Sequence, residues 1–417
     1  MSDEDKVASI DIHKKVLMVV VGSREGEAIG PQSELERRRF GTMTSELGRL
    51  SAWLRERGVK ETVMESTAGY WKPVWMELEP YMCLHLAQAF SNRAPKGRKN
   101  DFRDAERLRR RFLAGELILS FVPDPEQRAW RTLTRMKTRL ARHRAARLYS
   151  QVEDMLEEMR IKLCWVLSDL FGASGLGILQ ALAKGETDPK KLAALGDDRL
   201  KCTDEQLLDA LTGNRQATHR EMLGLYLDQL QWVDPQRTKL RGLIAEALKP
   251  YPEVVARLAE VPGFGPDSAQ QVMAEVGVRA SSFPSAGDLA SWVGTCPGEN
   301  ESAEENHSRR SPKGNRYMGR VLAEAAQAAV KAKGSHFQAV FRRKVPRLEY
   351  NGAIGAVAHR RCRLVWKILQ EGVRYVEPGA YRDPKARKQR AQSLARALRK
   401  LGYHVEITPV EPATAPA

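Results

Sequence analysis

The stretch from residue 127 to residue 163 constrains the fold more than any other part of the sequence. It reads QRAWRTLTRMKTRLARHRAARLYSQVEDMLEEMRIKL, with helical periodicity, many charges and neither glycine nor proline. These features predict one long and mostly exposed helix. A chain of 417 residues is long enough for about two to four domains, and the character of the sequence changes where this helix begins.

A second long helical pattern lies downstream. The segments HREMLGLYLDQLQW and PQRTKLRGLIAEALK place apolar residues three to four positions apart and are interrupted by Pro235. The stripe consists of Leu223, Leu227, Leu230, Leu240, Ile244 and Leu248. The two long helices are compatible with an antiparallel arm or with a dimer stalk, kinked at the proline. An ordinary helical bundle explains the periodicity equally well.

The part before the first long helix alternates strands and helices. VASIDIHKKVLMVVVG predicts two buried strands joined by a tight turn, and a third strand is expected near residues 38–43. A helix follows in TSELGRLSAWLRERG, with Thr44 or Ser45 as N-cap and Gly58 as its end. ETVMES and MCLHLAQ are predicted strands, and YWKPVWMELEPY and DFRDAERLRRRFLAGE are predicted helices. This order predicts an α/β domain over roughly residues 5–125.

A third region begins at EVPGFGPDSAQQVMAEVG. PGFGP between two helices resembles a helix-hairpin-helix, in which Gly263 and Gly265 would let backbone amides approach a phosphate. A tail rich in arginine and lysine from about Asp383 precedes a short strand pattern, YHVEITPV, and the final PATAPA is expected to be disordered. The predicted domains are therefore 1–125, 126–252, 253–382 and 383–417.

The charge balance points to a polyanionic partner. The chain carries 68 Lys and Arg against 52 Asp and Glu, a net charge of +16 that is spread along its length. This favours an extended phosphate-bearing partner over a small metabolite, with a well-solvated surface as the alternative.

The cysteines and the N-terminus indicate the compartment. Five dispersed cysteines that never form a C-x-x-C pair are typical of reduced thiols, not of a disulfide framework or a zinc site. No signal peptide is recognisable, and no apolar stretch approaches the ~20 residues of a membrane span. We therefore expect a cytoplasmic protein without a membrane partner.

Four acidic residues occupy suggestive positions in the first domain. Asp11 lies within an apolar strand, where an unpaired carboxylate is costly, and Glu65 ends another strand. Asp101 and Asp104 are three residues apart and share one helical face. If the fold gathers them, they form an all-oxygen site suited to Mg²⁺, and two such ions stabilise the attacking and leaving oxygens of phosphoryl transfer.

Each acid also has an ordinary explanation. Asp101 is compatible with a helix N-cap, and Asp104 with an i,i+3 partner of Arg107. Glu65 is compatible with a surface residue at a strand end.

The motifs around these acids resemble a known family. SIDIHKK, MESTAGYW and KNDFRDAERL resemble the three acidic motifs of the DEDD insertion-sequence transposases, the insertion-sequence-110 family, which are related to the Piv/MooV DNA invertases. VPGFGPDSAQQVMAEVG, FPSAGDLASWVGTCPGENESA, KGNRYM and AVAHRR resemble the family's second conserved domain, in the same order. The likeness covers nearly the whole chain.

The resemblance implies a fold and a site. It implies an α/β plus α protein with an N-terminal RuvC-like domain of the RNase H fold and a mostly helical C-terminal transposase domain. It makes Asp11, Glu65, Asp101 and Asp104 the ligands of Mg²⁺. In the second domain it implies a serine nucleophile, and the match falls on Ser302. The residues alone do not distinguish this serine from Ser308 or Ser311.

The sequence departs from the family pattern directly after that serine. Family members commonly read SAGK, whereas this chain reads SAEEN, with Glu304 and Glu305 in place of glycine and lysine. A lost lysine weakens phosphate contact near the scissile bond. The nearby residues that could compensate are His307, Arg309, Arg310 and Lys313.

The resemblance also implies a mechanism. The acidic tetrad holds Mg²⁺ against the scissile phosphate, and Ser302 from another subunit attacks phosphorus to form a transient phosphoserine link. A composite site needs a second subunit, so we expect a dimer or tetramer with the leucine-striped arm as interface. The expected phosphate contacts beside the tetrad are Arg103, Arg107, Arg109 and Arg110, with a solvated helix face as the alternative for each.

The implied partners are double-stranded DNA, at the element ends and the target, and a structured non-coding guide RNA, the bridge RNA. Such a guide fits a sequence without a zinc finger or an obvious base-reading helix, and RNA and DNA held by their backbones fit a large basic surface. Two other functions stay open. One is a RuvC-like junction nuclease that uses water as nucleophile, and the other is a non-catalytic nucleic-acid-binding relic.

Overall fold

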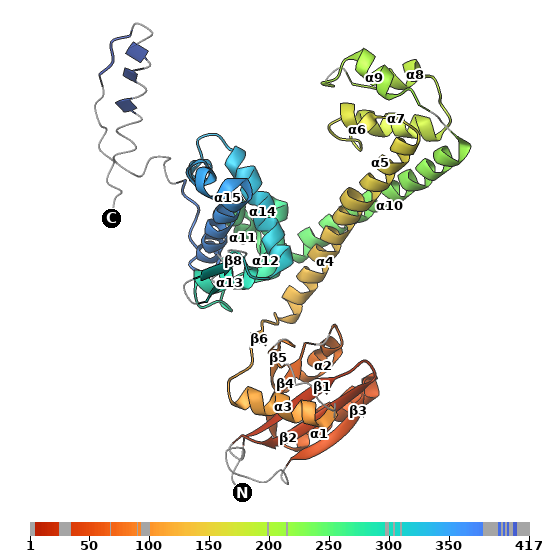
Figure 1. Cartoon of the computed structure of the whole chain (residues 1–417). Coiled ribbons are helices and arrows are strands. Elements are labelled where there is room, and N and C mark those ends of the chain that lie inside the picture. Colours follow the sequence, from red (N-terminus) through yellow and green to blue (C-terminus); the bar gives the residue numbers. More distant parts are fainter. Residues whose placement is uncertain are drawn as a thin grey trace. The chain divides into compact units, whose positions relative to one another are not determined.

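The chain forms two compact units, Met1–Pro123 and Asp124–Ala417, in a computed structural model (Figure 1). The structure describes residues 5–24, 35–66, 68–89, 91–92, 101–197, 200–213, 216–296, 300–302, 305–308, 311–377, 391–392, 395–396, 398–399 and 403–406. The first unit is α/β and the second is almost entirely helical. The finer divisions at 252/253 and 382/383 stay predictions.

The first unit is built on a six-stranded sheet of order β3-β2-β1-β4-β5-β6. Its strands are β1 (Lys6–Ile12), β2 (Val16–Ser23), β3 (Glu36–Gly41), β4 (Val59–Glu65), β5 (Cys83–Ala87) and β6 (Leu119–Ser120). The strands β1, β4 and β5 are parallel, and the other three are antiparallel to their neighbours. The alternation of strands and helices in the sequence is confirmed, and the third strand covers 36–41 where 38–43 was expected.

Helices cover both faces of this sheet. The helices α1 (Thr44–Glu56) and α2 (Trp71–Leu78) pack on one face, where Ile10 and Ile12 meet Leu50 and Leu78 in the main core. The helix α3 (Asp101–Leu113) lies against β1, β2 and β4 on the other face. Apolar runs in β1 and β2 follow from this, because central strands covered on both faces bury every side chain. The arrangement is consistent with an RNase H-like domain.

The N-cap expected for α1 is wrong. Met43 occupies the cap position without a side-chain hydrogen bond, and Thr44 is already the first helical residue. Instead the Glu46 carboxylate accepts a hydrogen bond from the backbone amide of Gly41 at 3.2 Å. Gly58 does end the helix, with a φ of 68°.

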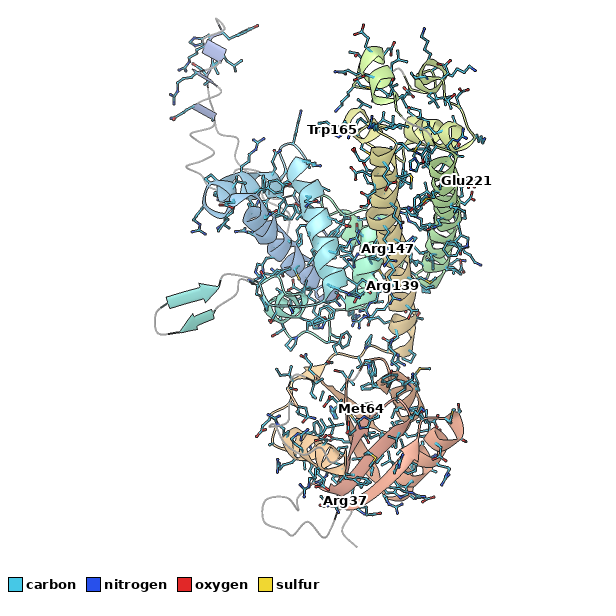
Figure 2. The ribbon with its side chains drawn as sticks, turned by 45° about the vertical axis from the view of Figure 1, so that its right-hand side comes forward. Arg37, Met64, Arg139, Arg147, Trp165 and Glu221 are labelled. Carbon is cyan, nitrogen blue, oxygen red and sulfur yellow. The ribbon has the colours of Figure 1, made fainter. Side chains whose placement is uncertain are left out.

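The second unit contains an antiparallel helical arm. One side is α4 (Pro125–Arg142), which continues through a π-helical segment, η2 (His143–Leu148), into α5 (Tyr149–Glu158). The helix α10 (Ala217–Ala247) returns beside it and runs through Pro235 as one helix. Figures 1 and 2 show the two sides together, with Arg139 and Arg147 labelled on the outgoing side. Trp130 touches Tyr251 at one end, with ring centroids 5.4 Å apart.

The tip of the arm has a hydrophobic core of its own. It is formed by α5, the first half of α10 and the short helices α6 (Leu163–Val166), α7 (Ala173–Ala183), α8 (Pro189–Ala193) and α9 (Asp204–Ala210). Leu223, Leu227 and Leu230 lie in this core. The expectation that the leucine stripe is a ready subunit interface is therefore wrong, because these leucines already pack within their own chain.

The rest of the unit is a helical domain with a small hairpin. Its helices are α11 (Pro252–Ala259), α12 (Pro266–Val276), α13 (Ala286–Val293), α14 (Arg316–Lys331) and α15 (His336–Gln370), and its strands are β7 (Asn300–Ser302) and β8 (Glu305–Ser308). PGFGP joins α11 and α12, as expected. The helix α15 is interrupted at Glu349, which has a φ of 57°.

The predicted C-terminal strand is not found where the structure describes the chain. Residues 403–406 form no strand. A strand needs a neighbouring edge to satisfy its backbone, and no sheet of the described residues pairs with this segment. The remainder of the YHVEITPV pattern and the PATAPA end lie outside the described residues. No helix in the described parts is long and apolar enough to cross a membrane.

Candidate active site

Two of the predicted acids end neighbouring parallel strands. The ladder between β1 and β4 pairs Ile10 with Met64, so Asp11 and Glu65 are the next residue on each strand. Residues in register on adjacent strands project to the same face of a sheet. Asp11 and Glu65 therefore share one face at the carboxyl ends of their strands.

The shared face is the one that α3 covers. The Ser9 hydroxyl donates a hydrogen bond to the Ala105 carbonyl at 2.7 Å, and Ser9 is fully buried. Side chains two residues apart on a strand point the same way, so Asp11 projects to the face of Ser9. Val63, which pairs with Ser9 across the ladder, packs with Leu108 of the same helix.

Two contacts fix how α3 runs along β1. Arg109 Nε donates to the Val7 carbonyl at 3.2 Å, and Ser9 reaches Ala105, so the helix is antiparallel to the strand. Two strand residues span about 6.6 Å and four helical residues about 6 Å, so the spacings match. One further step brings Asp11 level with Asp101, the first residue of α3. Asp101 is described only as part of this helix, and its side chain lies outside the description.

Asp11 is more accessible than its apolar surroundings suggested. It is the second-last residue of β1, not a mid-strand residue, and its side chain is 16% exposed. Its Oδ2 atom lies 3.1 Å from Nε2 of His13. The carboxylate is therefore partly accessible to solvent at the end of the strand.

Glu65 is held by an amide that sequence reasoning missed. Its Oε2 accepts a hydrogen bond from Nδ2 of Asn92 at 2.8 Å. Asn92 is only 4% exposed, and its Oδ1 has no hydrogen-bond partner in the described structure. An unsatisfied buried polar atom of this kind costs about 1–3 kcal/mol.

The basic residues of α3 divide into different roles. Arg107 Nη1 donates to Oδ1 of Asp104 at 2.8 Å, the i,i+3 pair that was the ordinary explanation for this aspartate. Arg103 and Arg110 are exposed.

Arg109 has a different role from the other arginines of α3. It is fully buried and donates hydrogen bonds to the carbonyls of Val7 and Ser23, so its predicted role as a phosphate contact is wrong. It fastens α3 to the sheet.

The oxygen donors fit a hard divalent cation. The described part of the acidic set offers carboxylates from Asp11, Glu65 and Asp104 and an amide oxygen from Asn92, the ligand types that Mg²⁺ prefers. Among the described side chains no three acidic, histidine or cysteine residues lie close enough to form a metal cluster. Asp101, the remaining member, is the one whose side chain is not described.

Ser302 ends the first strand of the β7–β8 hairpin and pairs with Glu305. Its side chain and those of Arg309 and Arg310 lie outside the description, and Lys313 is exposed. The segment that carries Ser302 begins at Gly294 and ends at Gly314, and the backbone at these two residues is in close contact. A Cβ on Gly294 would lie 2.5 Å from the Pro312 carbonyl oxygen, and one on Gly314 would lie 2.3 Å from the carbonyl carbon of Val293.

A buried ionic network joins the arm to this segment. Arg135 of α4 donates to both carboxylate oxygens of Glu275 on α12 at 2.8 Å, and Asn315 Nδ2 reaches the same carboxylate at 2.8 Å. The Oδ1 atom of Asn315 caps α14 by accepting from Tyr317 and Met318 amides. Burial lowers the pKa of neighbouring Arg131 to about 10. The network was not predicted, because its members lie far apart in the sequence.

The PGFGP loop packs against α14 and against the buried Arg361 of α15. Gly263 has a φ of 85°, and a Cβ there would lie 2.3 Å from the Ala325 carbonyl oxygen, so the glycine allows the loop to pack on α14. Gly265 is the N-cap residue of α12 and has open space around its Cβ position. The fully buried Arg361 contacts the loop and lies over the Phe264 ring at 4.3 Å. Burial lowers its pKa to about 10.

Comparisons with known proteins find two family matches along the chain. Residues 8–161 match a transposase family of the DEDD IS110 type, and residues 255–342 match the Transposase IS116/IS110/IS902 family. The chain is 26% identical over 323 residues to a "Probable family 20 transposase" of Pseudomonas aeruginosa, covering 75% of this chain and 84% of that protein. It is 27% identical over 188 residues to the "Insertion element IS110 uncharacterized 43.6 kDa protein" of Streptomyces coelicolor, covering 45% of each.

Two family matches thus follow one another along the chain in the order that the motifs predicted, and the first extends through the outgoing side of the arm. The first match begins before Asp11 and includes all four predicted acids. The second includes Ser302. Such proteins are enzymes that act on DNA, and their acidic motifs imply dependence on a divalent metal. The chain belongs to the insertion-sequence-110 family of DEDD transposases.

Proposed function

We propose that this transposase cleaves and exchanges DNA strands through a covalent link to Ser302, with Asp11, Glu65, Asp101 and Asp104 as the metal ligands. The observation that carries the proposal is the register of β1 and β4. It aligns Asp11 with Glu65 on the face that also receives the start of α3. Two Mg²⁺ ions bound there would neutralise phosphate charge and stabilise the attacking and leaving oxygens.

In the proposed reaction the Ser302 hydroxyl attacks the scissile phosphorus. The bond from phosphorus to the leaving deoxyribose oxygen breaks, and that oxygen takes up the proton that the serine hydroxyl gives up, by way of solvent. A phosphoserine link remains, which conserves the energy of the phosphodiester for joining to a second strand. His13, 3.1 Å from Asp11, is a neighbouring group that helps to orient this carboxylate.

The nucleic-acid interface proposed here uses exposed cations. Arg103 and Arg110 project from α3 into solvent, Arg103 in the first turn of the helix, where the acidic residues lie, and Arg110 near the other end. Lys313 is exposed at the end of the Ser302 segment. Arg107 contributes less positive charge to this interface, because it is already paired with Asp104. The family resemblance extends the partners to double-stranded DNA and a bridge RNA, and the net charge of +16 supports a large backbone-binding surface.

Self-association is proposed through a second stripe on α10. The apolar residues Leu225 and Trp232 are seven positions apart and are 62% and 60% exposed. Met222 and Leu243 extend the same stripe at heptad-compatible spacing. This stripe differs from the leucine stripe that packs inside the chain, so a dimer or tetramer can form without opening the arm.

The test is a covalent-adduct assay. The protein is incubated with element-end DNA, co-purifying RNA and Mg²⁺, denatured, and examined for DNA-linked protein. Wild type is expected to give an adduct that Ser302→Ala abolishes, while Ser308→Ala, a serine from the same hairpin, retains it. Cleaved DNA without an adduct in wild type and Ser302→Ala alike would indicate a water-using nuclease. Binding without cleavage in every variant would indicate a non-catalytic relic.

A further inference from the structure

Three parallel strands end beside the acidic set, and the third contributes a residue as well. Directly after β5 the chain turns, with the Ser91 amide donating to the Gln88 carbonyl at 2.9 Å. This turn delivers Asn92 to Glu65, which is paired with Ala87 of β5 in the sheet. The carboxyl ends of β1, β4 and β5 thus lead to Asp11, Glu65 and Asn92.

The two ends of the Asn92 amide are in different situations. The nitrogen donates to Oε2 of Glu65, and a carboxylate can only accept, so the nitrogen must face it. The oxygen is thereby directed elsewhere, and it has no hydrogen-bond partner in the described structure although the residue is 96% buried. A structural asparagine normally satisfies both ends of its amide.

We propose that Asn92 belongs to the metal centre: its amide nitrogen positions Glu65, and its amide oxygen is a neutral oxygen donor to the bound divalent cation or its hydration water. This inference rests on the proposed function of the acidic residues. It explains the unsatisfied oxygen, because a hydrated cation supplies the missing partner. It also explains why a neutral amide stands here, since another carboxylate next to Glu65 would repel it.

The test measures metal binding directly. Binding of Mn²⁺ to the full-length chain is followed by electron paramagnetic resonance of the free ion, in wild type, Asn92→Leu and Asn92→Asp. Asp11→Asn identifies which part of the binding belongs to the centre. The matched control is Thr62→Val, which removes a fully buried hydroxyl from the same strand as Glu65 but from the opposite face of the sheet.

The expected result is a rise of about 10- to 100-fold in the Mn²⁺ dissociation constant for Asn92→Leu, and wild-type binding for Thr62→Val. Asn92→Asp keeps an oxygen donor and adds charge, so it should bind Mn²⁺ at least as tightly as wild type. A dissociation constant for Asn92→Leu within twofold of wild type overturns the role of Asn92. Equal binding by wild type and Asp11→Asn overturns the metal centre itself, and the inference with it.

Thermal unfolding separates metal binding from a loss of folding. In Asn92→Asp two carboxylates face each other without a cation, so the Tm should fall in metal-free buffer and rise more on adding Mn²⁺ than the wild-type Tm does. A Tm of Asn92→Asp that falls by the same amount with and without Mn²⁺ would mean that Asn92 only supports the fold.

Discussion

Arg135 donates one hydrogen bond to each carboxylate oxygen of Glu275, both at 2.8 Å, although the two residues are 140 positions apart in the sequence. The Glu275 side chain is 3% exposed, and the backbone of the same helix also binds Arg131, which donates to the Ala274 carbonyl at 3.1 Å. The base of the arm is therefore attached to α12 by charge-assisted bonds, which are stronger than neutral ones.

Replacing Glu275 with glutamine should destabilise the second unit. Two guanidinium groups would then remain in a mostly buried place without their counter-charge, at a cost of about 3 kcal/mol. Urea unfolding followed by tryptophan fluorescence measures this, because Trp292 lies against Arg131. The control is Glu324→Gln, which breaks an exposed i,i+4 pair with Arg320 and should cost less than about 0.5 kcal/mol. An equal loss in the free energy of unfolding for the two variants would refute the idea that the buried network stabilises the unit more than the exposed pair does.

Changing Asp11 to asparagine should abolish strand cleavage and leave nucleic-acid binding within about twofold of wild type. The change removes one charge from the proposed metal ligands with little change in side-chain volume, and the proposed phosphate contacts are other residues. Cleavage of labelled element-end DNA and an electrophoretic mobility-shift assay measure the two properties. Loss of DNA binding in parallel with cleavage would mean that Asp11 supports the fold instead.

The two glycines of PGFGP should respond differently to alanine. Gly263→Ala forces a Cβ against the Ala325 carbonyl at a positive φ and should destabilise the unit by about 2 kcal/mol or more. Gly265→Ala meets open space and should cost less than about 1 kcal/mol, the usual loss when the residue at a helix N-cap becomes alanine. Chemical denaturation of both variants measures the difference. If Gly265→Ala weakened DNA binding without changing stability, Gly265 would remain a phosphate contact.

The Cys362 thiol should resist alkylation in alkaline solution. Burial raises its pKa from 9.0 to about 12, so the native thiol stays protonated at pH 9.5, whereas Cys83 is exposed. Mass spectrometry after brief iodoacetamide treatment should find Cys83 modified and Cys362 intact.

The same thiol should make stability depend on pH. Because the pKa of Cys362 in the folded chain lies above that in the unfolded chain, the thiol favours the folded state below pH 9. The benefit falls between pH 9 and 12 by up to about 1.4 kcal/mol per unit. Cys362→Ala should remove that part of the pH dependence.

The exposed stripe on α10 should control self-association. A charge at Leu225 or Trp232, as in Leu225→Glu and Trp232→Glu, should convert the oligomer to a monomer with little change in stability. Sedimentation equilibrium measures the mass. The comparison is Leu227→Glu, a buried position in the tip core, which should unfold the arm. A wild-type mass equal to one chain, with nucleic acid bound, would contradict self-association.

Much of the first unit could be predicted from the sequence, because local pattern and topology agree there. Apolar strands alternating with helices indicated the element order, and Glu65 was recognised at a strand end. Asp11 was placed inside its strand, whereas it is the second-last residue of β1. Arg109 shows the limit. Helical spacing puts it one turn after Ala105, on the sheet side, yet its charge suggested solvent. Only the three-dimensional position of the Val7 and Ser23 carbonyls explains how the guanidinium is satisfied.

The second unit was harder to predict, because periodicity does not identify a helix's partner. The leucine stripe of α10 fits an intermolecular coil as well as an intramolecular one, and the sequence offers no way to choose. Asn92 carried no signal at all, since a single asparagine in a turn is ordinary. Its importance follows from its proximity to Glu65, which the parallel order of β4 and β5 creates.

The backbone contact between Gly294 and Gly314 joins the two ends of the segment that carries Ser302. Because the atoms that meet here belong to the backbone, replacing a side chain elsewhere in the segment removes none of the atoms that make this contact. Glu304 and Glu305 belong to the segment between the two glycines. A change of charge next to Ser302 therefore leaves the atoms that join the ends of α13 and α14 in place.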